Sequence, residues 1–290
     1  MQASEPPPPL PVYEQPPVPG PGYIWTPGYW AWAPAGYFWV PGTWVMPPRV
    51  GFLWTPGYWG LVGGVYAFHA GYWGPHVGFY GGVNYGFGYG GVGFAGGRWV
   101  GNSFAYNQSV TNVNVSVIHN TYNETVVNNV TVNRVSYNGG AGGVVAAPTV
   151  QERGYAHEPH LAATPMQRQH FQQAGNNPEL LAKNNGGRPA IAATPHPGAF
   201  NAPGVVGAHA AGAPPPHPAP GFANGNNPSH GYGNRSGNGN QPHGGPPPGQ
   251  ANGNRSSQSA NGKGPAQKQK AAKPHPNKEN GRREPETALR

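Results

Sequence analysis

A six-residue phrase recurs along the first hundred residues and constrains the fold more than any other feature. It begins with an aromatic residue, has proline or alanine third and glycine fourth, and ends with tryptophan. Four copies begin at Trp25, Trp39, Trp54 and Phe68, so successive starts are 14, 15 and 14 residues apart, and a looser fifth copy covers 94–99. Regular spacing of this kind is typical of a structural repeat.

Each phrase predicts a tight turn between two short strands. Proline presets φ near about −65°, and the following glycine accepts the positive φ of a type II turn. Such a turn fits the twist of hairpin strands poorly, so an open bend between splayed strands is the alternative. The predicted turn residues are Pro27, Gly28, Pro41, Gly42, Pro56, Gly57 and Gly71. The aromatic residues predicted to face each other are Trp25 with Trp30, Trp39 with Trp44, Trp54 with Trp59, and Phe68 with Trp73.

The repeats predict a mainly β fold. Proline and glycine recur every few residues, which disfavours helix, and further turns near 34–36, 47–51 and 62–64 would connect the hairpins into an antiparallel meander. Long disordered segments are expected at both ends, because 48 glycines and 38 prolines supply much of the 290-residue chain. The expected segments are 1–21, proline-rich and disordered; 22–99, the β-repeat module; 100–138, a valine- and asparagine-rich β segment; 139–187, a linker with short helices; and 188–290, a disordered basic tail rich in glycine, proline and asparagine.

The residues after the repeats change character twice. From Asn112 to Val117 valine alternates with asparagine or serine, and a similar run follows at 126–137, so we predict two β-strands. Their valine faces could cover the aromatic face of the repeats or seed cross-β stacking. Beyond them, capping residues predict short helices at about 149–156, 164–174 and 177–186 within the linker.

Composition excludes several classes of chemistry. The chain has no cysteine, which rules out disulfides, thiolate metal sites, a cysteine nucleophile and a lipid-anchoring cysteine in the chain as given. Residues 1–21 lack the basic and apolar regions of a signal peptide, and no window is apolar for the ~18 residues of a membrane span, so we expect neither. The net charge of +8 is concentrated in 255–290, where nine lysine and arginine residues accompany three glutamates.

No arrangement of residues predicts catalysis. His157 and His160 are three residues apart, but Pro159 breaks the helix that would hold both toward a metal ion. Glu124 is the only acidic residue in 15–151, so paired-carboxylate chemistry lacks a second partner in the repeat region. We therefore expect no catalytic residue, no metal site and no cofactor.

The tryptophan row and the basic tail each allow two interpretations. The indoles either pack together as a core stripe or stand exposed and stack on sugar rings. The tail either keeps the chain soluble or adheres to anionic polymers such as envelope polysaccharide or nucleic acid. Specific recognition of nucleic acid is not expected, because aromatic and basic residues occupy different segments. Only Arg49 and Arg98 are charged in 22–99, so little opposes self-association.

The motifs carry a resemblance to a known family. The runs P-G-Y-I-W-T-P-G-Y-W-A-W, Y-F-W-V-P-G-T-W and L-W-T-P-G-Y-W-G resemble the WXXGXW, or YXWGXW, repeat proteins of Gram-negative bacteria. The resemblance implies export to the periplasm, the outer membrane or the cell exterior, and implies no particular molecular function. We therefore expect a non-enzymatic structural or adhesive protein of the cell envelope, or a secreted one. The alternatives are a glycan-binding module that uses exposed tryptophan and a nucleic-acid-associated protein that acts through its basic tail.

Overall fold

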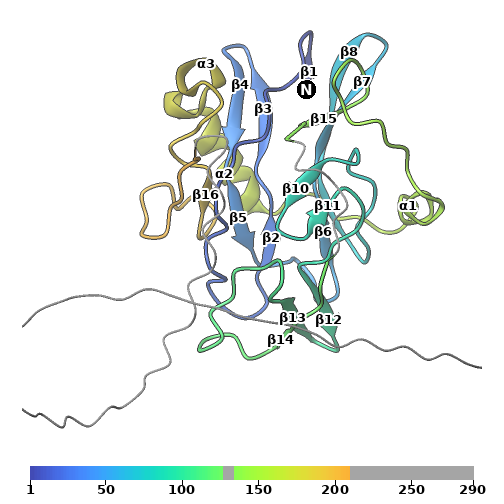
Figure 1. Ribbon diagram of the computed structural model, residues 1–290, viewed down its shortest axis with the longest axis vertical. Coiled ribbons are helices and arrows are strands. Elements are labelled where there is room, and N and C mark those ends of the chain that lie inside the picture. The colour runs from blue at the N-terminus through green and yellow to red at the C-terminus, as the bar shows by residue number, and fades with distance from the viewer. Residues whose placement is uncertain (127–133, 210–290) are drawn as a thin grey trace, which may run out of the picture. The chain divides into compact units, whose positions relative to one another are not determined.

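The computed structural model describes residues 1–126 and 134–209 (Figure 1). Within these ranges the fold is mainly β, built from short strands in small, mostly antiparallel sheets with a few short helices, which confirms the predicted class. Residues 210–290, which contain most of the predicted tail, and residues 127–133 of the second predicted valine strand lie outside the described residues.

Residues 20–45 form one long hairpin from two phrases. A turn at 34–35 reverses the chain, and each arm consists of two strands separated by a proline-containing break. The two strands next to the turn pair with each other, and the two outer strands pair with each other, all antiparallel. The strands are β2 (Ile24–Thr26) and β3 (Tyr29–Ala33) in the first arm, and β4 (Gly36–Val40) and β5 (Gly42–Val45) in the second.

Residues 53–74 repeat this arrangement with the third and fourth phrases. The turn lies at 63–64, so both turns that reverse the hairpins are among those predicted between phrases. The strands are β6 (Leu53–Thr55), β7 (Tyr58–Val62), β8 (Val65–His69) and β9 (Tyr72–Gly74). Across the two hairpins, the facing aromatic pairs are Trp25 with Trp44, Trp30 with Trp39, Trp54 with Trp73, and Trp59 with Phe68.

These pairs correct the prediction that the two aromatic residues of one phrase face each other. The residues predicted to form turns instead form breaks where the chain continues in the same direction, and none of the four glycines has a positive φ. The predicted turn residues at these breaks are Pro27, Gly28, Pro41, Gly42, Pro56, Gly57 and Gly71, and Gly42 is also the first residue of β5. The turn prediction was wrong because each phrase pairs with another phrase. The six residues of a phrase do not show whether it folds back on itself or pairs with a second copy.

The phrase glycines are required by a close approach of the two arms. A Cβ atom built on Gly28 would lie 2.8 Å from the Gly42 backbone nitrogen and would overlap the Trp39 indole. The same geometry recurs in the second hairpin, where a Cβ on Gly71 would lie 2.5 Å from the Trp54 ring. In each copy, the first aromatic ring of one phrase therefore covers the glycine of the partner phrase, which leaves no room for a side chain.

The N-terminal segment is packed, which corrects the prediction of disorder over 1–21. β1 (Gln2–Ala3) pairs with β8, and Leu10 and Val18 are buried. The carbonyls of Pro9 and Pro16 accept hydrogen bonds from repeat tryptophans. Proline keeps the segment extended, as expected, but its backbone carbonyls serve as acceptors for indole N–H groups, and composition alone does not reveal this role.

Residues 75–126 join the two hairpins from one side. Tyr89 is fully buried, and its hydroxyl donates to the carbonyls of Trp25 and Trp54, which are equivalent positions of the two hairpins. The fifth phrase forms no phrase pair; its Trp99 instead faces Phe104 in a separate hairpin. The strands are β10 (Asn84–Gly86), β11 (Tyr89–Gly90), β12 (Gly97–Val100), β13 (Ser103–Asn107) and β14 (Thr121–Tyr122).

The predicted strand at Asn112–Val117 does not form, so this prediction was wrong. Asn114 accepts a hydrogen bond from the Ser116 amide through its side chain and from the Val117 amide through its carbonyl, which makes a turn. Val115 remains exposed. Asparagine side chains compete with strand pairing in this way, and this competition overrides the alternating pattern.

The first two expected helices are confirmed, and the third is divided into a 3₁₀ turn and a short helix. The segment that holds them is not a linker. Complete capping boxes form at Thr149 with Glu152 and at Thr164 with Gln167. The elements are β15 (Tyr137–Asn138), α1 (Val150–Tyr155), α2 (Pro165–Gly175), a 3₁₀ turn at Pro178–Leu180, α3 (Ala182–Asn185) and β16 (Ala193–Thr194).

α2 and β16 extend the folded part beyond its predicted end. Figure 1 shows both beside β4 and β5, and Ala193 and Thr194 pair with β5 and are fully buried. Phe171 of α2 packs on Phe38 of β4, with ring centroids 5.5 Å apart. The predicted linker and the first part of the predicted tail, 188–209, are therefore part of the same core as the repeats. No helix in 1–126 or 134–209 has the length and apolarity to cross a membrane.

Candidate functional site

The tryptophans of the four phrases are buried in the core. Their exposed fractions run from 0% to 7%, and the largest value belongs to Trp54. Facing rings meet at centroid distances of 5.1 to 5.3 Å, edge to face in the first hairpin and tilted in the second. These indoles therefore form no exposed row on the surface on which sugar rings could stack, and Trp54 alone among them lines a cavity. The buried set is Trp25, Trp30, Trp39, Trp44, Trp54, Trp59 and Trp73, while Phe68 is half-buried.

Most of these indole N–H groups donate hydrogen bonds to segments that are distant in the sequence. Trp39 donates to the Ala192 carbonyl at 2.9 Å, Trp59 to the Trp30 carbonyl at 2.8 Å, and Trp73 to Gln167 Oε1 at 2.8 Å. Two indoles differ. Trp25 Nε1 is buried, and within the described ranges no residue accepts a hydrogen bond from it or from Trp54 Nε1.

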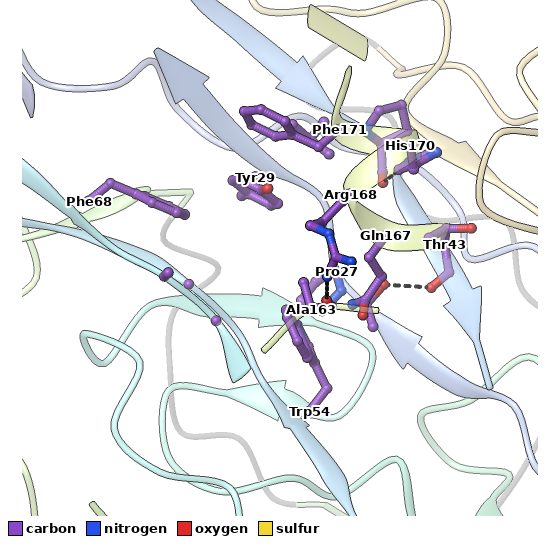
Figure 2. A pocket seen from close by; sticks show the side chains of 16 residues that line it. Pro27, Tyr29, Thr43, Trp54, Phe68, Ala163, Gln167, Arg168, His170 and Phe171 are labelled. Carbon is purple, nitrogen blue, oxygen red and sulfur yellow. Dashed lines mark hydrogen bonds between the residues drawn. The ribbon is translucent and has the colours of Figure 1, made fainter. Parts of the chain in front are cut away.

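A cavity of about 180 Å³ lies where the breaks of both hairpins meet α2. Figure 2 shows Tyr29, Phe68 and Trp54 on the strand side and Gln167 and Arg168 reaching from α2 toward them. The strand-side lining comes from Thr26, Pro27, Tyr29, Val40, Pro41, Thr43, Trp54, Gly57, Phe68, Ala70 and Gly71, and the helix side from Ala163, Gln167, Arg168, His170 and Phe171. The cavity therefore exists because the breaks in the two hairpins lie side by side beneath α2.

The hairpins match a known family model over 20–45 and 49–73. The chain contains two WXXGXW repeats. Each copy of the WXXGXW repeat coincides with one hairpin and therefore includes two phrases, which confirms the resemblance inferred from the motifs. The tryptophan and glycine positions that name the repeat are in contact across its two arms, since the first aromatic ring of the phrase in one arm covers the glycine of the other. No curated protein and no solved structure matches this chain.

The side chains over the WXXGXW breaks have defined hydrogen-bonding states. Gln167 Oε1 accepts from the Trp73 indole and from the Thr164 amide, and its NH₂ group has no partner among the residues that the structure describes. His170 Nε2 donates to the Pro41 carbonyl at 2.9 Å, and Nδ1 accepts from the Gly198 amide at 3.0 Å. Both nitrogens of His170 are thus occupied, and the ring is held neutral.

Burial sets the protonation of two lining groups. It lowers the pKa of His170 to about 4, because the enclosed imidazolium loses hydration; the hydrogen bond to Pro41 opposes this shift only in part. It raises the pKa of Tyr29, whose hydroxyl therefore stays protonated. The hydroxyl of Tyr29 has no hydrogen-bond partner in the described part of the chain. Tyr29 can therefore donate into the cavity.

His170 predicts a pH dependence of stability. Its pKa is about 4 in the folded state and about 6.5 when unfolded, so the unfolded chain binds the extra proton between these values. The free energy of unfolding therefore falls as pH drops from about 6.5 to 4, with a loss of about 2 kcal/mol between pH 7 and pH 5 from this group. Urea unfolding of the native protein and of His170→Gln at both pH values measures it. Equal losses in the two proteins would contradict this assignment.

His160 and Glu124, for which the sequence predicts no site, make local contacts outside the cavity. His160 stacks on Tyr72 at a centroid distance of 3.8 Å, and its Nε2 lies 3.1 Å from the Tyr155 carbonyl oxygen. Glu124 pairs with Arg98 at 3.3 Å. No group of three metal-ligating side chains occurs in 1–126 or 134–209.

A second groove, of about 460 Å³, lies between the second WXXGXW repeat and α1. Its lining includes Glu152, whose Oε2 accepts from the Thr149 amide while Oε1 has no partner within the described ranges. This oxygen is enclosed by protein atoms rather than open to the groove.

Sequence reasoning missed the residues that line the cavity from α2. Gln167 and Arg168 follow a threonine-proline start that predicts the helix correctly, but nothing local indicates that this helix covers the repeat breaks. The spacing of Thr164 and Gln167 was the available signal for the orientation of the helix start.

Proposed function

We propose that this chain is a non-enzymatic structural or adhesive protein of the Gram-negative cell envelope or its exterior. The burial of the phrase tryptophans carries the proposal. They are engaged in edge-to-face contacts and in hydrogen bonds to the N-terminal segment, α2 and the residues before β16. Such a core supports a stiff module rather than a surface that displays indoles. The resemblance to exported Gram-negative repeat proteins supports the location.

The adhesive part of the proposal concerns residues 255–290. Nine basic residues against three glutamates give this stretch a charge of +6, out of +8 for the chain. Lysine and arginine in a low-complexity segment favour contact with an anionic polymer through many weak, salt-sensitive interactions. We propose envelope polysaccharide as that polymer and self-association of the repeat module as the route of assembly.

Cosedimentation tests this role. The full chain is expected to pellet with lipopolysaccharide vesicles at 50 mM NaCl, to be released at about 500 mM because salt screens the contacts, and to lose binding when 255–290 is deleted. Fractionation of the source bacterium is expected to recover the protein with the envelope or the medium. Recovery in the cytosol would contradict the proposed location. Stronger and more salt-resistant binding to RNA than to the vesicles would favour the nucleic-acid alternative instead.

A further inference from the structure

We propose that the cavity between the WXXGXW repeats and α2 binds a small ring-shaped carboxylate. The ring would lie against Tyr29, Phe68 and Trp54, and the carboxylate would lie at Arg168. This inference does not depend on the envelope role, because it rests on the cavity alone and would stand if that role proved wrong.

The walls fit an apolar ring. Tyr29 and Phe68 stack on each other, one from each repeat, with ring centroids 5.2 Å apart and planes 16° from parallel. Trp54 is the least buried tryptophan of the four paired phrases, and Phe171 closes the helix side. An apolar cavity of about 150 Å³ accepts benzene, so by volume about 180 Å³ suits a six-membered ring with one small substituent.

The polar groups with free capacity on the lining are mainly donors. The orientation of Gln167 is fixed because two groups donate hydrogen bonds to its side-chain oxygen. Its NH₂ group therefore remains as a donor for a ligand. Trp54 Nε1 is a donor only, and no described residue accepts from it. Arg168 donates one N–H to the Ala163 carbonyl and has others free, and in the described ranges no carboxylate lies within ion-pair distance of it. An anionic acceptor is the complement of this set.

Other ligand classes fit less well. A sugar hydroxyl donates as well as accepts, and the lining offers no carboxylate to receive its hydrogen bonds. An amine or other cation would face Arg168, the only charged lining residue, with no compensating acid. The neutral state of His170, held by two hydrogen bonds, adds no second charge. The charge balance therefore selects a monoanion.

Calorimetric titration of the full chain with sodium benzoate tests the proposal. We expect saturable one-site binding in the millimolar range and at least tenfold weaker binding of benzamide, which keeps the ring and lacks the charge. Arg168→Gln should weaken benzoate binding at least tenfold, because it removes the charge-assisted hydrogen bond to the carboxylate. Arg168 is an exposed helical residue, so we expect the fold to be retained. Ala163→Leu should abolish binding by filling the cavity.

Arg153→Gln is the matched control. Arg153 occupies the same position on α1 that Arg168 occupies on α2, since each side chain donates to the carbonyl of the residue before the capping threonine. It does not line the cavity. Benzoate affinity within twofold of the native protein in Arg153→Gln, together with the loss in Arg168→Gln, supports the site. Equal loss in both, equal binding of benzamide and benzoate, absence of saturable benzoate binding, or stronger binding of methyl glucoside would each overturn it.

Discussion

Replacing Gly28 by alanine is expected to lower the free energy of unfolding by about 3 kcal/mol. The added methyl group would meet the Gly42 backbone nitrogen and the Trp39 indole, and neither can yield without opening the paired arms. The loss should be visible as a lower midpoint in urea unfolding followed by tryptophan fluorescence.

Gly154→Ala is the control for this substitution. Gly154 lies in α1, and a Cβ atom built there meets nothing within 4 Å. Alanine in an exposed helical position is expected to stabilise by up to about 1 kcal/mol. Equal effects of the two substitutions would mean that the arms of the hairpin do not approach as closely at Gly28 as described here.

Replacing Trp59 by alanine should cost about 4 kcal/mol. The side chain is 1% exposed, lies edge to face with Tyr37 of the first repeat, and donates to the Trp30 carbonyl. The substitution therefore removes both a large apolar volume and a hydrogen bond between the two repeats. Thermal and urea unfolding of the variant measure the loss.

Phenylalanine at two tryptophan positions separates these contributions. Trp59→Phe removes an indole N–H that donates to Trp30, whereas Trp25→Phe removes an indole N–H that has no partner in the described structure. We expect Trp59→Phe to be less stable than Trp25→Phe by about 1 kcal/mol. The reverse order would show that the hydrogen bond from Trp59 does not hold the repeats together.

Capping signals in the sequence predicted the helix starts, whereas the Pro-Gly turn signal and the alternating valines at 112–117 did not predict the local structure. The capping boxes at Thr149 and Thr164 depend on residues three positions apart, and both form as expected. The mainly β class followed from proline, glycine and the aromatic phrase. The sequence did not show which phrase pairs with which, because Trp25 would present the same face to Trp30 as to Trp44. That choice depends on contacts between distant residues and on the close approach at the glycines.

Packing also explains why composition misjudged the ends of the folded region. Proline at 1–21 and small residues at 188–209 are typical of disorder, yet Pro16 and Ala192 supply carbonyls to buried indoles. The cavity was unpredictable for the same reason. Arg168 has the sequence features of an ordinary exposed helical cation, and only the docking of α2 places it beside the breaks of both repeats.

Disulfide trapping tests the pairing of phrases most directly, since the chain has no native cysteine. Thr26 and Thr43 are direct cross-strand partners in the first repeat, while Thr26 and Tyr29 would flank a turn if each phrase formed its own hairpin. We expect Thr26→Cys with Thr43→Cys to form an intramolecular disulfide under mild oxidation, and Thr26→Cys with Tyr29→Cys to remain reduced. Oxidation of the second pair and not the first would contradict the paired-phrase fold.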